Sequence, residues 1–215
     1  MMKSIVVIVG PSGVGKSTVA YKMLELDGRF EFVRSATTRP RRDDGKTDEY
    51  IYLTEKEFFD RVENGKMLEH MRYGDNYYGT PASEVESIFS EGKIPLLVLD
   101  INGAKSLRAG NFPFRSVIVY VYEMLDVIID RLVARAGDTP TQKELENIEK
   151  RKVLNIADYR SLPEISHLFD DFIRNVSVDE TALAVIKLLA DIQNGKERDG
   201  EKIDTVVDEL YSSAK

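Results

Sequence analysis

Cysteine is absent from this chain of 215 residues, and histidine occurs only twice. Disulfides and thiolate metal sites are therefore excluded. His70 and His167 lie far apart in the sequence and have no companion ligands nearby, so they do not indicate a metal pair. The sequence thus gives no sign of a metal site built on sulfur or imidazole.

Long hydrophobic runs and blocks of basic residues are also lacking. The N-terminal apolar run, Ile5 to Val9, has five residues, whereas a membrane-spanning helix needs about 20, and we expect no signal peptide. The formal net charge is −7, which argues against a nucleic-acid or anionic membrane surface. We therefore expect a cytoplasmic protein that acts on small molecules as a monomer or homodimer.

Hydrophobic residues make up 42% of the chain and charged residues 31%, which is typical of a folded globular protein. The length suits one sizeable core with a small insertion. We find no internal repeat and expect a single folding unit.

The N-terminal run leads directly into a glycine-rich loop. Five β-branched apolar residues predict a central strand of a parallel sheet. The following pattern, G-x-x-x-x-G-K-S, lets successive backbone N–H groups converge on phosphate oxygens at the start of a helix. Lys16 is expected to reach the β- and γ-phosphates, and Ser17 to ligate Mg²⁺. The residues expected to hold the phosphates of ATP are Gly10, Ser12, Gly13, Val14, Gly15, Lys16, Ser17 and Thr18.

The segment Ser35 to Arg42 is dense in hydroxyl and guanidinium groups. Guanidinium forks bind phosphate oxygens bidentately, so the segment suits an oxyanion. It also suits a solvated loop whose arginines pair with Asp43 and Asp44. The residues alone leave both interpretations open.

Two carboxylates have possible roles in binding. A glutamate such as Glu69, among Met67, Leu68 and Met71, is usually a surface residue, but a carboxylate here can accept from both N1–H and N2–H of guanine, with Thr80 donating to O6. Asp100 ends a second buried strand, 94–100, where a carboxylate near Mg²⁺, acting through water, is expected beside the phosphate loop. The alternative for Asp100 is a turn residue.

Other patterns place further elements. Strands are expected at 30–34, 50–53, 116–121 and 172–175, and helices at 54–64 with a Thr54/Glu57 capping box, at 82–91 and at 126–135. We interpret 136–152, which is polar, as a mobile flap carrying Arg151. A helix after 175 should bury Leu183, Ile186, Leu189 and Ile192. Residues 195–215 form a charged tail with one helix at 203–210 and an apolar stripe of Ile203, Val206, Val207 and Leu210.

Together these motifs resemble those of guanylate kinases, a family of P-loop nucleoside monophosphate kinases, over about residues 5–189. The segments that carry the resemblance are S-A-T-T-R-P at 35–40, L-E-H at 68–70, N-Y-Y-G-T at 76–80 and R-L-V-A-R at 131–135. The resemblance implies an α/β P-loop NTPase fold in three layers, with a parallel core sheet, an inserted monophosphate-binding region and a helical lid. It implies a core at 1–34, 91–135 and 157–194, a GMP-binding region at 35–90 and a lid at 136–156.

The resemblance also implies the activity and the roles of residues. The γ-phosphoryl group of Mg·ATP would pass to GMP, giving ADP and GDP. Arg131 and Asn175 would lie on the ATP side. The GMP-binding residues would be Ser35, Arg39, Arg41 or Arg42, Tyr50, Glu69, Tyr78, Thr80 and Asp100, and the catalytic cations Lys16, Arg39, Arg42, Arg135 and Arg151.

The sequence departs from the family pattern in three places. Because Pro40 is displaced by one position, the second phosphate arginine is Arg42 if spacing from Arg39 is kept, which we favour, or Arg41 if the distance to Tyr50 is kept. The D-I-N-G segment has Asn102 in place of a carboxylate, and the lid is longer than usual. Two alternatives are a related kinase for another phosphate ester, such as a ribose bisphosphate, and an inactive guanylate-kinase-like interaction module.

Overall fold

The computed structural model describes residues 3–41, 50–137 and 139–215, and its core is a five-stranded sheet in the order β2-β7-β1-β8-β9. The central strand β1 (Ser4–Val9) pairs with β7 (Ile94–Val98) and β8 (Arg115–Tyr122), and the edge strands are β2 (Phe30–Phe32) and β9 (Asp171–Arg174). All four pairings are parallel. The predicted α/β fold with a parallel core sheet is confirmed.

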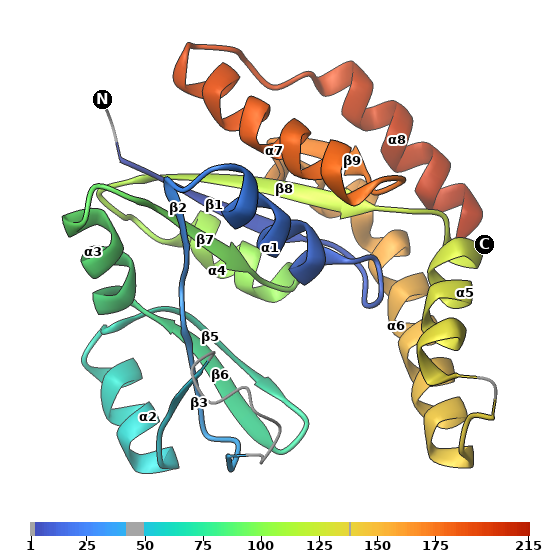
Figure 1. The fold of residues 1–215 in the computed structure, drawn as a ribbon, viewed down its shortest axis with the longest axis horizontal. Helices are drawn as coiled ribbons and strands as arrows, with labels where there is room; N and C mark the ends of the chain where they lie inside the picture. Colours follow the sequence, from blue (N-terminus) through green and yellow to red (C-terminus); the bar gives the residue numbers. More distant parts are fainter. Residues whose placement is uncertain (1–2, 42–49, 138) are drawn as a thin grey trace.

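Burial explains why the central strands were predictable. All residues of β1 are buried, and Val7 pairs with Leu97 on one side and Ile118 on the other. Helix α1 (Lys16–Leu26) packs against α7 (Val178–Gln193), while α4 (Ile101–Ala109) contacts β1 and β8 (Figure 1). Because both faces of the sheet are covered, its central strands are continuous apolar runs.

A second sheet, in the order β4-β3-β6-β5, forms the insertion. Its strands are β3 (Ser35–Thr37), β4 (Tyr50–Tyr52), β5 (Met67–Tyr73) and β6 (Asn76–Pro81). Helix α2 (Glu55–Glu63) has the predicted capping box between Thr54 and Glu57, and α3 (Ala82–Ser90) leads back to β7. In Figure 1 the insertion extends from one end of the core sheet.

Helices α5 (Leu125–Ala136) and α6 (Gln142–Ile165) pack against each other on the side of the molecule away from the insertion (Figure 1). Residues 142–152, which the polar composition led us to expect as a flap, form the first half of α6, which begins at a Thr141/Glu144 capping box. This agrees with a helical lid. The helix runs unbroken past residue 156, where we expected the lid to end.

The C-terminal helices correct one prediction and confirm another. Leu183 is 54% exposed, whereas the buried face of α7 includes Ala182, Val185 and Leu189. The predicted residues were spaced three apart, whereas a helix repeats every 3.6 residues. Each step of three therefore moves further round the helix, and Leu183 lies outside the buried face. Helix α8 (Gly200–Ser213) buries Ile203, Val207 and Leu210, and it packs against α6, β9 and the short 3₁₀ turn Ser166–Leu168.

Among the described helices, none has the length and apolar character that a membrane crossing requires.

Candidate active site

The glycine-rich loop joins β1 to α1, and its glycines are required by geometry. Gly10, Gly13 and Gly15 have φ angles of +151°, +92° and +103°. A Cβ atom on Gly10 would lie 2.0 Å from Val121 O, and one on Gly15 would lie 2.7 Å from Asn175 Nδ2. The loop is therefore seated tightly against the carboxyl ends of β8 and β9, in a backbone conformation that side chains rarely adopt.

Lys16 closes the loop on itself. Its Nζ donates to Gly10 O at 2.7 Å and to Pro11 O at 3.0 Å. Burial lowers the pKa of Lys16 to about 8, while the nearby carboxylates of Asp158 and Asp100 oppose this effect. The ammonium group thus lies within the loop, where it donates to backbone carbonyls.

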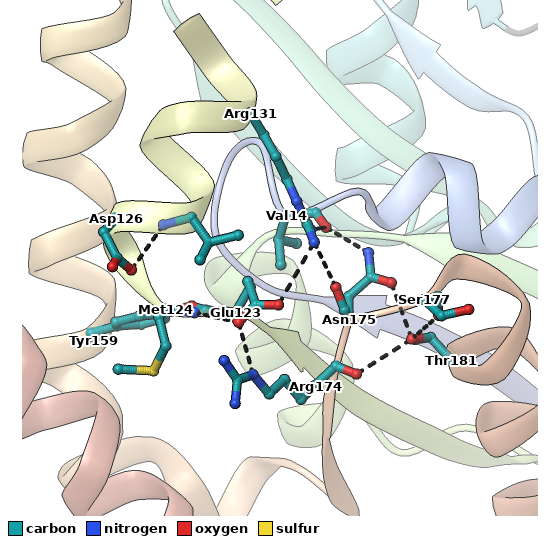
Figure 2. Close-up of polar contacts among 11 residues, drawn as sticks. Val14, Glu123, Met124, Asp126, Arg131, Tyr159, Arg174, Asn175, Ser177 and Thr181 are labelled. Atoms are coloured by element: carbon teal, nitrogen blue, oxygen red, sulfur yellow. Dashed lines mark hydrogen bonds and ion pairs between the residues drawn. The ribbon is translucent and has the colours of Figure 1, made fainter. Parts of the chain in front are cut away.

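Two predicted ATP-side residues hold the loop from behind (Figure 2). Val14 O accepts from Arg131 Nη1 at 3.2 Å and from Asn175 Nδ2 at 2.7 Å. Arg131 Nη2 also donates to Asn175 O at 2.8 Å, and Thr181 Oγ1 donates to Asn175 Oδ1 at 3.0 Å. Val14 is fully buried. It therefore helps to hold the loop in place through the two hydrogen bonds that its carbonyl accepts from Arg131 and Asn175.

A buried carboxylate that the sequence did not reveal supports this arrangement. Glu123, which is 3% exposed, follows β8 and lies with Oε2 at 3.6 Å from Arg131 Nη2 (Figure 2). Its Oε1 accepts from Arg174 Nε at 2.8 Å and from Met124 N at 2.9 Å. Two guanidinium groups therefore offset the desolvation of this carboxylate, which in turn orients Arg131.

A cavity of about 670 Å³ lies over the loop. It brings together predicted residues from three parts of the chain, namely the loop, Asp100 after β7, and Arg135 and Arg151 of the α5–α6 pair. The loop residues that line it are Gly10, Ser12, Gly13, Gly15, Lys16, Ser17 and Thr18. Of the predicted phosphate-binding residues of the loop, Val14 alone is outside this lining.

Asn155 and Asp158 of α6 line the same cavity and were missed by sequence reasoning. Burial raises the pKa of Asp158 to about 6, an effect that the charge of Lys16 opposes. No local pattern marks either residue, because Asn155 and Asp158 meet the loop only through the tertiary fold. Their spacing of three on a helix is the one available signal, since it places both on one face.

A second cavity, of about 360 Å³, is lined by five of the predicted GMP-binding residues, whereas Arg39, Arg41 and Thr80 are outside its lining. Met71 and Asp100 line both cavities, so the two adjoin. The side chains that line the smaller cavity include Ser35, Tyr50, Glu69, Tyr78 and Asp100.

Glu69 is the buried acid of this cavity. It is 5% exposed, and Thr80 Oγ1 donates to its Oε1 at 2.7 Å. Burial raises the pKa of Glu69 to about 7, against the effect of the Thr80 hydrogen bond. The alternative of an ordinary surface glutamate is therefore wrong. The Thr80 hydroxyl, which we expected to donate to O6 of guanine, donates to Glu69 in this structure.

Asp100 has a structural role besides its place between the cavities. Its Oδ1 accepts from Gly103 N at 2.8 Å and so caps α4. A cap fixes the carboxylate at the carboxyl end of β7, where it faces both cavities. We gave two interpretations of Asp100, as a turn residue and as a residue of the site. The two are compatible, because its side chain caps α4 and also lines both cavities.

The predicted phosphate arginines differ in setting. The Arg39 guanidinium lies over the Tyr50 ring, 5.3 Å from its centroid, and its buried Nε has no hydrogen-bond partner among the described residues. The Arg41 guanidinium lies 5.1 Å from the Tyr52 centroid, and Arg41 is exposed. Arg42 is outside the described residues.

A glycine-rich loop with a half-buried lysine follows a central parallel strand, and Arg135 and Arg151 of the α5–α6 pair line the cavity over it, beside a second cavity. This arrangement defines a P-loop kinase. The family model described as guanylate kinase matches residues 2–192. The chain belongs to the guanylate kinase family, whose members use ATP and GMP.

Individual relatives agree with this assignment. A guanylate kinase of Prochlorococcus marinus (strain MIT 9312) is 35% identical over 188 residues, covering 87% of this chain and 97% of that protein. One of Onion yellows phytoplasma (strain OY-M) is 35% identical over 193 residues, covering 88% and 84%. The crystal structure of guanylate kinase from Anaplasma phagocytophilum superposes with a TM-score of 0.64 at 25% identity, covering 92% and 89%.

Proposed function

We propose that this protein transfers the γ-phosphoryl group of ATP to the phosphate of GMP, and that the larger cavity takes ATP while the smaller takes GMP. The observation that carries the assignment of the acceptor is the buried Glu69–Thr80 pair next to the loop cavity. A carboxylate that is buried in this way is stabilised when a ligand donates to its remaining oxygen. Guanine offers two adjacent donors, N1–H and N2–H, whereas adenine offers one donor and one acceptor on the corresponding edge.

The chemistry needs no general base, because the attacking oxygen belongs to a phosphate that is already an anion. Catalysis then consists of positioning and charge neutralisation. Lys16 would exchange its bonds to loop carbonyls for bonds to the β- and γ-phosphates. Arg135 and Arg151 would approach the transferring group from the lid, and Arg39 would hold the GMP phosphate with Arg42, Tyr50 and Tyr78.

Magnesium fits two oxygen donors of the larger cavity. The Ser17 hydroxyl and the Asp100 carboxylate, which line it, are hard ligands of the kind that this ion prefers. Ser17 would ligate the ion directly and Asp100 through water. When bound, the ion would neutralise charge on the phosphates of ATP.

One assay tests the function. ADP formation is followed by a coupled reaction with GMP, dGMP, AMP, UMP or a ribose bisphosphate as acceptor, each with Mg²⁺ and again with a chelator. We expect the highest kcat/KM with GMP and none without the metal. A better rate with the ribose bisphosphate would favour the related-kinase alternative, and no transfer to any acceptor would favour the interaction module.

A further inference from the structure

The side-chain amide of Asn155 forms two hydrogen bonds with the backbone of one residue of the glycine-rich loop, Ser12. Ser12 N donates to Asn155 Oδ1 at 2.8 Å, and Asn155 Nδ2 donates to Ser12 O at 2.9 Å. Asn155 is completely buried. A carboxamide presents one acceptor and two donors in one plane, so it satisfies the N–H and the C=O of Ser12 together.

Ser12 is a sensitive position in the loop. It lies between Pro11, whose carbonyl accepts from Lys16 Nζ, and Gly13, which has a φ of +92°. Fixing Ser12 fixes the peptide planes on either side and hence the direction of the N–H groups that follow. With Val14 held by Arg131 and Asn175, the loop is fastened at two residues.

Asn155 also lies where α6 passes from a mostly exposed first half to a second half with buried side chains. Before it, Arg151 and nearly all residues from 142 onward are exposed. After it, Tyr159 and Leu162 are buried, and the Tyr159 hydroxyl donates to Glu123 O. Arg151 lies four positions before Asn155, so both are on one face of the helix, and both line the larger cavity.

We propose that Asn155 is a positioning residue that couples the shape of the phosphate loop to the placement of Arg151 on the lid helix. The inference rests on the proposed roles of the loop and the lid. While Ser12 is held, the loop keeps its binding conformation and α6 directs Arg151 over it. Without these two hydrogen bonds, the loop spends most of its time in other conformations, and the apparent affinity for ATP falls in proportion to the fraction that keeps the binding conformation.

The first test is the Asn155→Ala variant, with binding of ATP and of GMP measured separately by titration calorimetry. Loss of both partners of a buried peptide group is expected to weaken ATP binding by roughly tenfold to a hundredfold. Binding of GMP alone should stay within about twofold, because the smaller cavity does not include Asn155. A role in packing alone would lower the melting temperature and leave the affinity of the folded protein for ATP unchanged, which would overturn the proposal.

A double-mutant cycle with Arg151 tests the coupling itself. kcat/KM for ATP is measured at saturating GMP in the wild type, Asn155→Ala, Arg151→Ala and the double variant. If Asn155 acts through the lid, Arg151→Ala should reduce kcat/KM much less in the Asn155→Ala background than in the wild type. Reductions that multiply independently would overturn the proposal.

The matched control is Asp170→Ala. Asp170 Oδ2 likewise accepts from a backbone group in a distant segment, Ile118 N at 2.7 Å, and from Arg108, and it is outside both cavities. This variant should lower the melting temperature and leave the ATP affinity within about twofold of the wild type.

If Asn155→Ala does not fold, Asn155→Asp replaces it. The carboxylate keeps an acceptor for Ser12 N but has no donor for Ser12 O, and the same outcomes apply. If the wild type binds ATP but fails to phosphorylate GMP, the proposed function fails while the binding measurements still decide the role of Asn155.

Discussion

Replacing Glu69 with glutamine should reduce the use of GMP and at the same time make the folded protein more stable above pH 7. The substitution keeps the size of the side chain, and an oxygen remains to accept from Thr80 Oγ1. It removes a charge from a buried site and puts an NH₂ donor where guanine requires an acceptor. The first change should increase the stability of the fold, and the second should decrease the activity with GMP.

The stability effect follows from the pKa of Glu69, which rises from its ordinary value of 4.5 to about 7 because of burial. Since the unfolded chain releases this proton more readily than the folded chain, the free energy of unfolding falls as the pH rises from about 4.5 to about 7, and stays low above that. At 1.36 kcal/mol per unit, the ionised carboxylate destabilises the fold by about 3 kcal/mol at pH 8. Glutamine removes this term and should raise the melting temperature at pH 8 more than at pH 5.

The functional effect follows from hydrogen bonding. A buried group of guanine that loses its partner costs about 1–3 kcal/mol. The value of kcat/KM for GMP should therefore fall by roughly tenfold to a few hundredfold, while that for AMP should hardly change. Because kcat/KM reports on the free enzyme, wild-type kcat/KM for GMP should also decline as the pH falls below about 7, and the variant should lack that decline.

The assay is a pair of measurements on the same preparations, namely kcat/KM for GMP and AMP, and urea unfolding at pH 5 and pH 8. Glu86, an exposed glutamate of α3, provides the control, since Glu86→Gln should alter neither. A GMP/AMP preference that survives in Glu69→Gln would show that this carboxylate does not read the base. A loss of stability at pH 8 would refute the account of its burial.

Other substitutions test the phosphate-binding residues. Lys16→Ala should abolish phosphoryl transfer in the coupled assay while leaving the circular dichroism melt cooperative, because the lysine neutralises charge that grows in the transition state; a variant with the wild-type rate would contradict the kinase assignment. Arg39→Lys should raise KM for GMP and leave KM for ATP nearly unchanged, since an ammonium group lacks the fork that binds phosphate bidentately; equal changes in both would place Arg39 elsewhere in the reaction. Of Arg41→Ala and Arg42→Ala, the second should increase KM for GMP more, and the reverse order would assign the contact to Arg41.

The parts of the fold that were predictable from sequence are those fixed by local patterns. The strand at Ile5–Val9 has apolar side chains throughout because both of its faces are covered, and the capping box at Thr54 and Glu57 involves residues three apart. Strand β5 was missed because its local pattern is interrupted. Leu68 and Glu69 are consecutive and both buried, so the alternation typical of a strand is broken where β5 lines the smaller cavity.

The same distinction applies to the site. The residues of the loop and Arg135 occur in short motifs, so they were predictable from the sequence. Asn155 contacts a residue 143 positions away, and Glu123 is satisfied by Arg131 and by Arg174, which is 51 positions away. These partners come together only when the sheet and the lid have formed. A lone polar residue in a helix or at a strand end gives no local signal of such a role.

Charge distribution shows why the overall composition was a poor guide to the substrates. The chain has a net charge of −7, yet basic side chains outnumber the two acidic ones around the larger cavity. The charged residues of its lining are Lys16, Arg72, Lys105, Arg135, Arg151, Asp100 and Asp158. A recessed site with low-dielectric walls concentrates such a field, while charges on distant surfaces are screened within about 10 Å at 0.1 M salt. Polyanionic phosphates are therefore attracted to this cavity although the protein as a whole would repel them. The smaller cavity meets this one at Asp100 and Met71. Under the proposed function the same cations would therefore also offset the charge of the acceptor phosphate, so that the two anions could approach each other.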